Sequence, residues 1–276
     1  MPGKDTAPGI KGYGLAGAVA YLTVSIGMKL SRVPLAGRLV DRFAAKKRLR
    51  VVTIPVGAAL KSSPAVLPFD AAKRLIEASS YICATRVCMC REAGGCRDYP
   101  VSLGCLFLGQ GARSMGRHIG VHEVTKGEAL AHLEQARSLG LVTNLIWSSL
   151  ELNALGADPA YTVELCSCCP CCCLAFKTRG ASRAFIDGIA GFGLAKVVAP
   201  DDCTRCTNCV HACPFGAIRV DMHDGPNVDS GRCKGCGRCE TACKPRVLKI
   251  FPVEPAERAT PLPGTMYLEE FLTMVR

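Results

Sequence analysis

The chain has 276 residues, of which 49% are hydrophobic and 21% charged, a composition that fits a globular or membrane-associated protein and excludes a disordered one. The net charge is +11, but eight basic residues and one acidic residue fall within residues 29–50, so the rest is only mildly basic and nucleic-acid binding is not expected. The 19 cysteines, an odd number, exclude a closed disulfide framework and indicate metal binding in a reducing compartment.

Residues 1–50 are predicted to form an apolar helix followed by a basic amphipathic segment. Between Lys11 and Lys29 lie 17 uncharged residues, which is the lower limit for a membrane span. Because the basic block follows this run, the remainder of the chain is expected in the cytoplasm, attached to the cytoplasmic face of the membrane. Membrane contact is expected through residues 12–50, as a span or as an interfacial helix. A helix that binds a partner subunit and an internal core helix are the alternatives.

The expected fold is α+β, with a cysteine-rich α/β domain over residues 51–200. The run RVVTIPV at 50–56 predicts a buried strand, and Asp70 is placed to cap the helix that follows it. Thr125 and Glu128 have the spacing of a capping box at the start of a second helix.

This second helix is predicted to stop at Gly140, ahead of another strand-like run, LVTNLIW. Its apolar side is predicted to consist of Leu130, Leu133, Ala136 and Leu139.

Residues 201–252 contain one cysteine pattern twice. The segment CTRCTNCVHACP has the spacing C-x2-C-x2-C-x3-C-P, and CKGCGRCETACKP repeats it with Lys244 before the proline. This spacing is typical of bacterial two-cluster ferredoxins, where the fourth cysteine of each motif binds the other cluster. The predicted ligands are Cys203, Cys206, Cys209 and Cys243 for one 4Fe-4S cluster, and Cys233, Cys236, Cys239 and Cys213 for the second.

A zinc ribbon is the alternative to these two clusters, but it explains the duplicated pattern poorly. Gly235 and Gly237 are expected to let the backbone approach a cluster closely. The segment AIRVDMHDGPNVD between the motifs predicts a hairpin with an Asp-Gly turn. Residues 253–276 are expected to be a proline-rich tail that ends in a short docking helix, MYLEEFLTMVR.

Eleven cysteines remain, in two segments of the cysteine-rich domain that are expected to converge. Neighbouring side chains diverge, so the consecutive cysteines of CSCCPCCC cannot all face one cluster, and some pack as small hydrophobic residues or serve another site. That site is predicted to be a third iron–sulfur cluster in preference to zinc, redox-active thiols or inert burial. The candidates are Cys83, Cys88, Cys90, Cys96, Cys105, Cys166, Cys168, Cys169, Cys171, Cys172 and Cys173.

These segments resemble a family of 4Fe-4S dicluster-domain proteins of anaerobic bacteria and archaea, which have a cysteine-rich domain ahead of the ferredoxin motifs. The resemblance covers roughly residues 50–250. The matching positions are Cys88, Cys90 and Arg91; Cys105 and Leu106; Gly116 and Arg117; Glu128, Ala129 and Leu130; and the cysteine run at 166–173. Ser167 and Pro170 depart from it, because the family is expected to have Asn and Gly there. The resemblance implies the fold and the clusters but no substrate.

The predicted function is that of an iron–sulfur electron-transfer subunit, not of a stand-alone enzyme. Its partner would be a flavoprotein, a quinone-linked membrane complex or a larger reductase. A reductase with its catalytic centre in the cysteine-rich domain, and a maturation or scaffold protein that carries clusters, are the alternatives. Arg91 and Arg117 could offset the charge of a thiolate-ligated cluster or lie on the surface. His122 could be a ligand or an ordinary surface residue.

Overall fold

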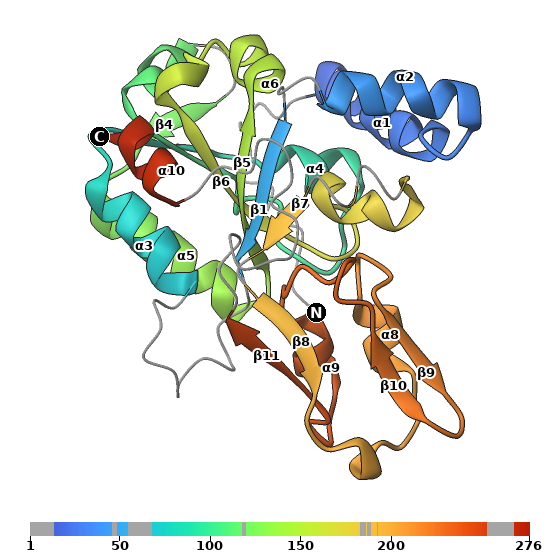
Figure 1. Cartoon of the computed structure of the whole chain (residues 1–276). Coiled ribbons are helices and arrows are strands. Elements are labelled where there is room, and N and C mark those ends of the chain that lie inside the picture. The colour runs from blue at the N-terminus through green and yellow to red at the C-terminus, as the bar shows by residue number, and fades with distance from the viewer. Residues whose placement is uncertain are drawn as a thin grey trace.

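A seven-stranded sheet forms the centre of the computed structural model (Figure 1). The structure describes residues 14–45, 49–54, 68–117, 120–182, 186, 189–191, 193–252 and 268–276. Across the sheet the strands are Val121–Glu123 (β4), Ile82–Thr85 (β2), Leu106–Leu108 (β3), Val163–Cys168 (β6), Val142–Ser148 (β5), Leu49–Ile54 (β1) and Ile189–Gly191 (β7). Neighbouring strands are antiparallel except for the parallel pair β1 and β7. The mixture of helices and strands confirms the α+β class.

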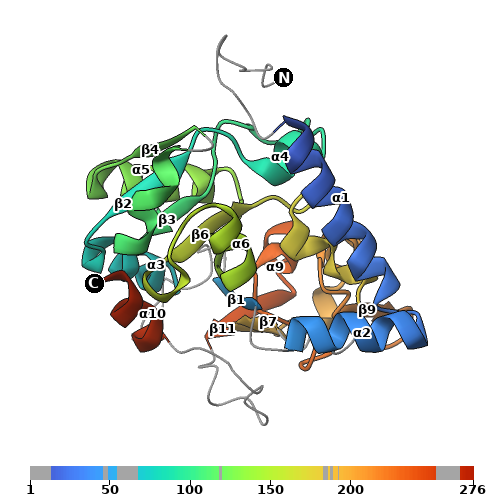
Figure 2. The ribbon, with the colours of Figure 1, turned by 90° about the horizontal axis from the view of Figure 1, so that it is seen from above.

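Three helices cover one face of this sheet (Figure 2). They are Pro68–Ala78 (α3), Lys126–Ser138 (α5) and Leu268–Val275 (α10). Side chains alternate between the two faces of a strand, so Leu165 and its neighbour on β3, Leu106, both pack into the core beneath the helices. Phe271 and Val275 of α10 are fully buried in the same core. The C-terminal helix therefore docks on the sheet of its own chain.

The helix predictions were right in outline and wrong in two details. The capping box of Thr125 and Glu128 is confirmed at the start of α5, and Gly140 follows the end of that helix with a φ of +69°. The buried side of α5 is Ala129, Leu133 and Ala136, because these positions share one helix face, whereas Leu139 is 40% exposed.

The second error concerns α3. The helix begins at Pro68, so Asp70 lies inside its first turn, and its prediction as the N-cap was wrong. Proline is favoured at the start of a helix because its missing N–H group has no helical partner to lose there. The two strand-like runs are strands β1 and β5.

Two helices near the N-terminus, Gly14–Leu30 (α1) and Pro34–Ala45 (α2), lie on the side of the sheet away from α3 (Figure 2). Helix α1 packs against Met89–Ala93 (α4) and the 3-10 helix Leu174–Gly180 (η3). Tyr21 and Met28 are buried in this contact. Within the described ranges, no helix combines the length and the apolar composition that a membrane crossing requires.

The other face of the sheet is covered by short elements. Gln110–Arg117 (η1), Ser149–Ala154 (α6) and Pro159–Tyr161 (η2) lie there, and Cys83 and Phe107 are buried beneath η1 and α6. On β6 the same alternation directs Glu164, Cys166 and Cys168 to this face. The helical face is thus aliphatic, while part of the opposite face consists of thiols and a carboxylate.

The C-terminal region lies below the sheet in Figure 1. It contains Gly193–Val197 (β8), Pro200–Asp202 (η4), Asn208–Ala212 (α8), Ile218–Asp221 (β9), Gly225–Val228 (β10), Arg238–Ala242 (α9) and Leu248–Pro252 (β11). Strands β8 and β11 pair with each other, and β9 and β10 form the predicted hairpin. Its connection is stabilised by the Asp221 carboxylate, which accepts hydrogen bonds from the backbone N–H groups of His223 and Asp224. Gly225, with a φ of +78°, begins the returning strand.

Candidate functional site

The two cysteine motifs share one backbone conformation. Arg205 and Gly235 occupy the same place in their motifs and have φ values of +54° and +63°, and Thr207 and Gly237 correspond with +58° and +84°. A left-handed residue among right-handed ones turns successive N–H groups toward a common point, which creates a concave anion site. Arginine and threonine adopt this conformation at a cost, and such strain persists mainly at functional sites. The backbone of both motifs is therefore shaped to receive a negatively charged group.

The first set of thiols opens to solvent. Cys203, Cys206, Cys209 and Cys243 line one pocket that opens to solvent, and we call them the open thiol set. Cys206 is exposed, while Cys209 is buried. Burial and the neighbouring thiols of Cys243 and Cys203 raise the pKa of Cys209, which places the fourth cysteine of the second motif beside the first motif.

The second set of thiols is enclosed. We call Cys213, Cys233, Cys236 and Cys239 the buried thiol set, because each is only 6% or 7% exposed. Burial raises the pKa of Cys236 to about 12, and the thiols of Cys213 and Cys233 act in the same direction. Cys213 therefore lies with the second motif, although it belongs to the first.

Both sets have the chemistry that a 4Fe-4S cluster needs. All eight donors are thiols, and thiolates are the protein ligands of such clusters. A thiol must lose its proton to bind a metal, and the positive charge of a bound metal stabilises the thiolate in a buried site. Backbone N–H groups already point at sulfur: Ala217 donates to Cys213 Sγ at 3.3 Å, and Ala195 and Gly235 donate to Cys233 Sγ at 3.4 Å. Hydrogen bonds of this kind stabilise negative charge on sulfur.

Gly235 also has a role that the sequence did not indicate. A Cβ atom at this position would collide with the backbone of Gly193. The close approach that requires glycine here joins the second motif to β8, whereas the sequence placed it against a cluster. The glycine thus fixes the buried thiol set against the strand that enters the region.

Lys234, between two cysteines of the buried thiol set, is only 2% exposed. Its ammonium donates a hydrogen bond to the carbonyl of Gly231 at 3.4 Å. Sequence reasoning missed it, because a lysine in a polar motif is normally solvated. A buried positive charge beside a cluster site favours the more negative, reduced form of the cluster.

The buried thiol set adjoins the cysteine-rich domain. Phe215, two residues after Cys213, meets the ring of Phe176 edge-on at a centroid distance of 5.7 Å. Arg238 of α9 donates to the carbonyl of Gly140 at 3.2 Å, beyond the end of α5. One core contains all four cysteines of the set together with Cys168, Cys169, Cys172 and Cys173. The buried thiol set therefore adjoins the cysteine-rich segments, and Cys209 of the open thiol set belongs to the same core.

The two remaining cysteine segments meet at several places, and at two of these at least three metal-ligating side chains gather. At the first, Cys105 Sγ lies 2.9 Å from Cys166 Sγ, and Cys166 donates to the carboxylate of Glu164 at 2.9 Å. Burial raises the pKa of Glu164, and the charge of Glu164 together with burial raises the pKa of Glu151 to about 8. This cluster offers only two thiols and a carboxylate within 4.8 Å of one another.

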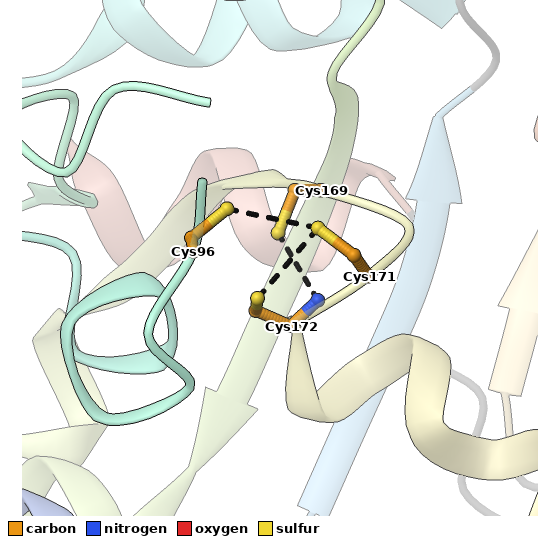
Figure 3. Close-up of side chains that lie close together, drawn as sticks. All are labelled: Cys96, Cys169, Cys171 and Cys172. Carbon is orange, nitrogen blue, oxygen red and sulfur yellow. Dashed lines mark hydrogen bonds between the residues drawn. The ribbon is translucent and has the colours of Figure 1, made fainter. Parts of the chain in front are cut away.

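At the second meeting place four thiols converge, as Figure 3 shows. Cys96 follows α4, and its Sγ lies 3.6 Å from that of Cys171 in the turn after β6. Cys169 and Cys172 come from the same turn, and all four sulfur atoms lie within 4.8 Å of one another. We call Cys96, Cys169, Cys171 and Cys172 the compact thiol set.

The other candidates are distributed around these sites. Cys83 is buried beneath η1, where its thiol faces the carbonyl of Ala112 at 3.9 Å. Cys88 is buried at the start of α4. A hydrogen bond with the thiol of Cys173, together with burial, holds the pKa of Cys90 well above its ordinary value. Cys90 thus contacts the second cysteine segment at Cys173, but none of these three thiols belongs to either of the two ligand groups.

Arg91 lies at the centre of the cysteine-rich domain. It is 1% exposed and donates to the carbonyls of Ser167 and Leu103. Burial lowers its pKa, but surrounding thiols, first that of Cys88, more than reverse the effect. The surface interpretation of this arginine was wrong, because the guanidinium holds β6 to the α4 segment. The side chain of Arg117 lies outside the described part of the chain, and His122 is exposed.

Comparison with known proteins identifies the region of the two cysteine motifs. Residues 195–244 match the family model of the 4Fe-4S dicluster domain. Pyruvate synthase subunit PorD of Methanocaldococcus jannaschii is 40% identical over 43 residues, which are 16% of this chain and 50% of that protein. One subunit of the Na⁺-translocating ferredoxin:NAD⁺ oxidoreductase complex of Acetobacterium woodii is 30% identical over 81 residues, 29% of this chain and 20% of that protein.

The chain thus spans between a fifth and a half of the length of these two relatives. No solved structure matches it. The family model covers both cysteine motifs, and it shows that this region is a ferredoxin-type iron–sulfur domain.

Proposed function

We propose that this protein transfers single electrons through two 4Fe-4S clusters, one held by the open thiol set and one by the buried thiol set. The observation that carries the proposal is the exchange of the fourth cysteines. Cys243 lines the pocket of the first motif. Cys213 lies close enough to Cys236 of the second motif to raise the pKa of that thiol. This exchange is the arrangement of two-cluster ferredoxins, and it holds two clusters close together.

The two thiol sets differ in exposure, and this difference assigns an outer and an inner end to the proposed relay. Each bound cluster would accept and release one electron. Because Cys206 is exposed at the open thiol set, a redox partner can approach there. The buried thiol set excludes water and adjoins the cysteine-rich domain, while Lys234 compensates negative charge inside it. The open thiol set is thus the partner-facing end and the buried thiol set the inner end.

The partner is proposed to be a flavoprotein, a quinone-linked membrane complex or a larger reductase. Support comes from the relatives, which are named as subunits of pyruvate synthase and of a ferredoxin:NAD⁺ oxidoreductase complex. The pocket lined by the open thiol set also supports a subunit role, because it opens to solvent where a partner protein can dock.

Attachment to the cytoplasmic face of the membrane is proposed for α1 and α2. Their outward sides present large apolar side chains next to basic ones, and this combination suits an anionic membrane surface. The exposed apolar residues are Leu15, Val19, Leu22, Val24, Ile26, Leu30, Val33, Leu35 and Leu39. Co-sedimentation with vesicles of anionic phospholipid tests this: binding should weaken strongly in Leu22→Ser/Leu35→Ser, and equal binding by that variant would contradict it.

The proposed exchange of cysteines is tested by electron paramagnetic resonance of the full chain after reduction with dithionite. In Cys203→Ala/Cys206→Ala and in Cys233→Ala/Cys236→Ala, about half of the iron should be lost, leaving the signal of the other cluster. Cys243→Ala should then perturb the signal that Cys203→Ala/Cys206→Ala removes. If it perturbs the other signal, the exchange is wrong.

The proposal also includes a metal or redox site in the cysteine-rich domain, supported by the convergence of its thiols at two places. Such a site would give the inner end of the relay a neighbour within the same chain.

A further inference from the structure

The compact thiol set is the densest group of potential metal ligands in the described residues. Its four sulfur atoms lie within 4.8 Å of one another, and no carboxylate or imidazole is part of the group. Cys96 lies on one segment and the other three on a turn far along the chain, so the set joins two parts of the cysteine-rich domain (Figure 3).

The spacing of these sulfur atoms distinguishes between kinds of metal centre. Cys171 Sγ is 3.6 Å from Cys96 Sγ and 3.6 Å from Cys172 Sγ. A tetrahedral metal ion with metal–sulfur bonds of about 2.3 Å places its ligand sulfurs about 3.8 Å apart. A 4Fe-4S cluster puts a cube of iron and sulfide between its thiolates, so these must stand further apart. The observed spacing is that of a single ion.

The eight ferredoxin-type cysteines provide an internal comparison. They are all described, yet no three of them have sulfur atoms within 4.8 Å of one another. The open thiol set instead lines a pocket that opens to solvent. The same chain therefore contains widely spaced thiols in the ferredoxin motifs and contracted thiols at Cys96 and the turn after β6.

The surroundings of the compact thiol set hold it in place. The N–H group of Cys172 donates to Cys169 Sγ at 3.4 Å, and the N–H group of Cys96 donates to the carbonyl of Arg91 at 2.9 Å. The hydroxyl of Tyr21 on α1 donates to the carbonyl of Cys172 at 2.8 Å. Lys177 lies over the Tyr21 ring at 4.2 Å. The ligand turn is thus fixed by α1 on one side and by the α4 segment on the other.

We propose that Cys96, Cys169, Cys171 and Cys172 bind one Zn²⁺ ion in a closed four-thiolate site. A complete set of four protein ligands leaves no position for a substrate, and four soft thiolates in a tetrahedral arrangement favour zinc. The ion would join the turn after β6 to α4 and, through Tyr21, to α1. Sequence reasoning preferred an iron–sulfur cluster to zinc in this domain, and the spacing favours the reverse for these four thiols.

The experiment combines metal analysis with X-ray absorption at the zinc edge, which the iron of other clusters does not affect. The full chain, purified anaerobically, should contain about one zinc with four sulfur neighbours at about 2.3 Å. Cys171→Ser should lose at least nine-tenths of this zinc and keep its iron and sulfide, and because Cys171 is exposed the substitution opens no cavity. Cys83→Ala, a buried cysteine outside the set, is the matched control and should keep both metals.

Three results would overturn the assignment: zinc that persists in Cys171→Ser, zinc with oxygen or nitrogen neighbours, or a loss of iron in place of zinc in that variant. The last would mean that the set belongs to an iron centre. Loss of the ferredoxin-type clusters alone would leave the zinc signal intact, so a failure of the electron-transfer proposal is distinguishable from a failure of this one.

Discussion

The two cysteine-rich regions of the molecule differ in how far apart their sulfur atoms lie. The C-terminal region has eight cysteines and the cysteine-rich domain has eleven. In the C-terminal region, which has a repeated spacing and left-handed residues such as Thr207 and Gly237, no three of the eight sulfur atoms lie within 4.8 Å of one another. In the cysteine-rich domain a strand and its following turn bring thiols into direct contact, at 2.9 Å for Cys105 and Cys166. The comparison teaches that cysteine density alone does not predict a cluster; the backbone between the cysteines decides how far apart the sulfur atoms stand.

The largest expected effect comes from a substitution that disturbs the backbone of one cysteine motif. In Gly235→Ala the new Cβ would collide with Gly193 and the residue would also keep a φ of +63°. Overpacking and the left-handed conformation together should cost about 3 kcal/mol of unfolding free energy and empty the buried thiol set. Thermal unfolding and iron content of the anaerobic protein measure both effects.

The matched control is Gly140→Ala, where φ is +69° and nothing lies within 4 Å of the added Cβ. It should cost only about 1 kcal/mol and leave the iron unchanged. Equal losses in the two variants would show that the contact with Gly193 does not matter.

The second test compares a buried lysine at one proposed cluster site with an exposed lysine at the other. Lys234→Met removes a positive charge that is 2% exposed, so the reduced cluster loses stabilisation and its midpoint potential should fall by something on the order of tens of millivolts. Redox titration followed by electron paramagnetic resonance reports the shift. Lys244→Met, at an exposed lysine next to Cys243, should have a much smaller effect because water screens that charge. A larger shift in Lys244→Met would reverse the assigned inner and outer ends.

The third test concerns the anchoring of the compact thiol set. Tyr21→Phe leaves the carbonyl of Cys172 without its buried donor. The unfolding free energy should fall by about 1–2 kcal/mol, and zinc should be released to a chelator faster. Tyr161→Phe, at a tyrosine that is 58% exposed, is the control and should change neither quantity. Unchanged zinc release in Tyr21→Phe would mean that α1 does not support the turn.

The smallest expected effect is a pH dependence outside both thiol regions. Burial lowers the pKa of His132 from its ordinary 6.5 to about 4, so protonation favours the unfolded chain. The stability that neutral His132 provides is complete above pH 6.5 and is lost as the pH falls toward 4. When the pH falls from about 7.5 to about 5.5, the unfolding free energy of the unsubstituted protein should decrease by roughly 1 kcal/mol more than that of His132→Gln.

Chemical denaturation at the two pH values measures this difference. His122→Gln, at an exposed histidine, should follow the unsubstituted protein at both values. If His132→Gln shows the same pH dependence as the unsubstituted protein, the buried imidazole is not its source.

The sequence was sufficient where a local pattern determines geometry. The T-x-x-E pattern predicted the start of α5, because it depends on residues a few positions apart. The ferredoxin spacing is equally local, and its assignment of eight cluster ligands stays a prediction. It was insufficient where long-range packing decides. Nothing near Cys96 in the sequence indicates Cys171, and Arg91 and Lys234 are charged residues whose burial depends on the whole domain.

The central claim is that the contrast in thiol spacing reflects two kinds of metal centre in one chain. The most direct measurement is the content of iron, acid-labile sulfide and zinc per chain in anaerobically purified, full-length protein. The account predicts about eight iron, about eight sulfide and about one zinc. About twelve iron with no zinc would contradict it, because the contracted thiols of the cysteine-rich domain would then hold a third cluster.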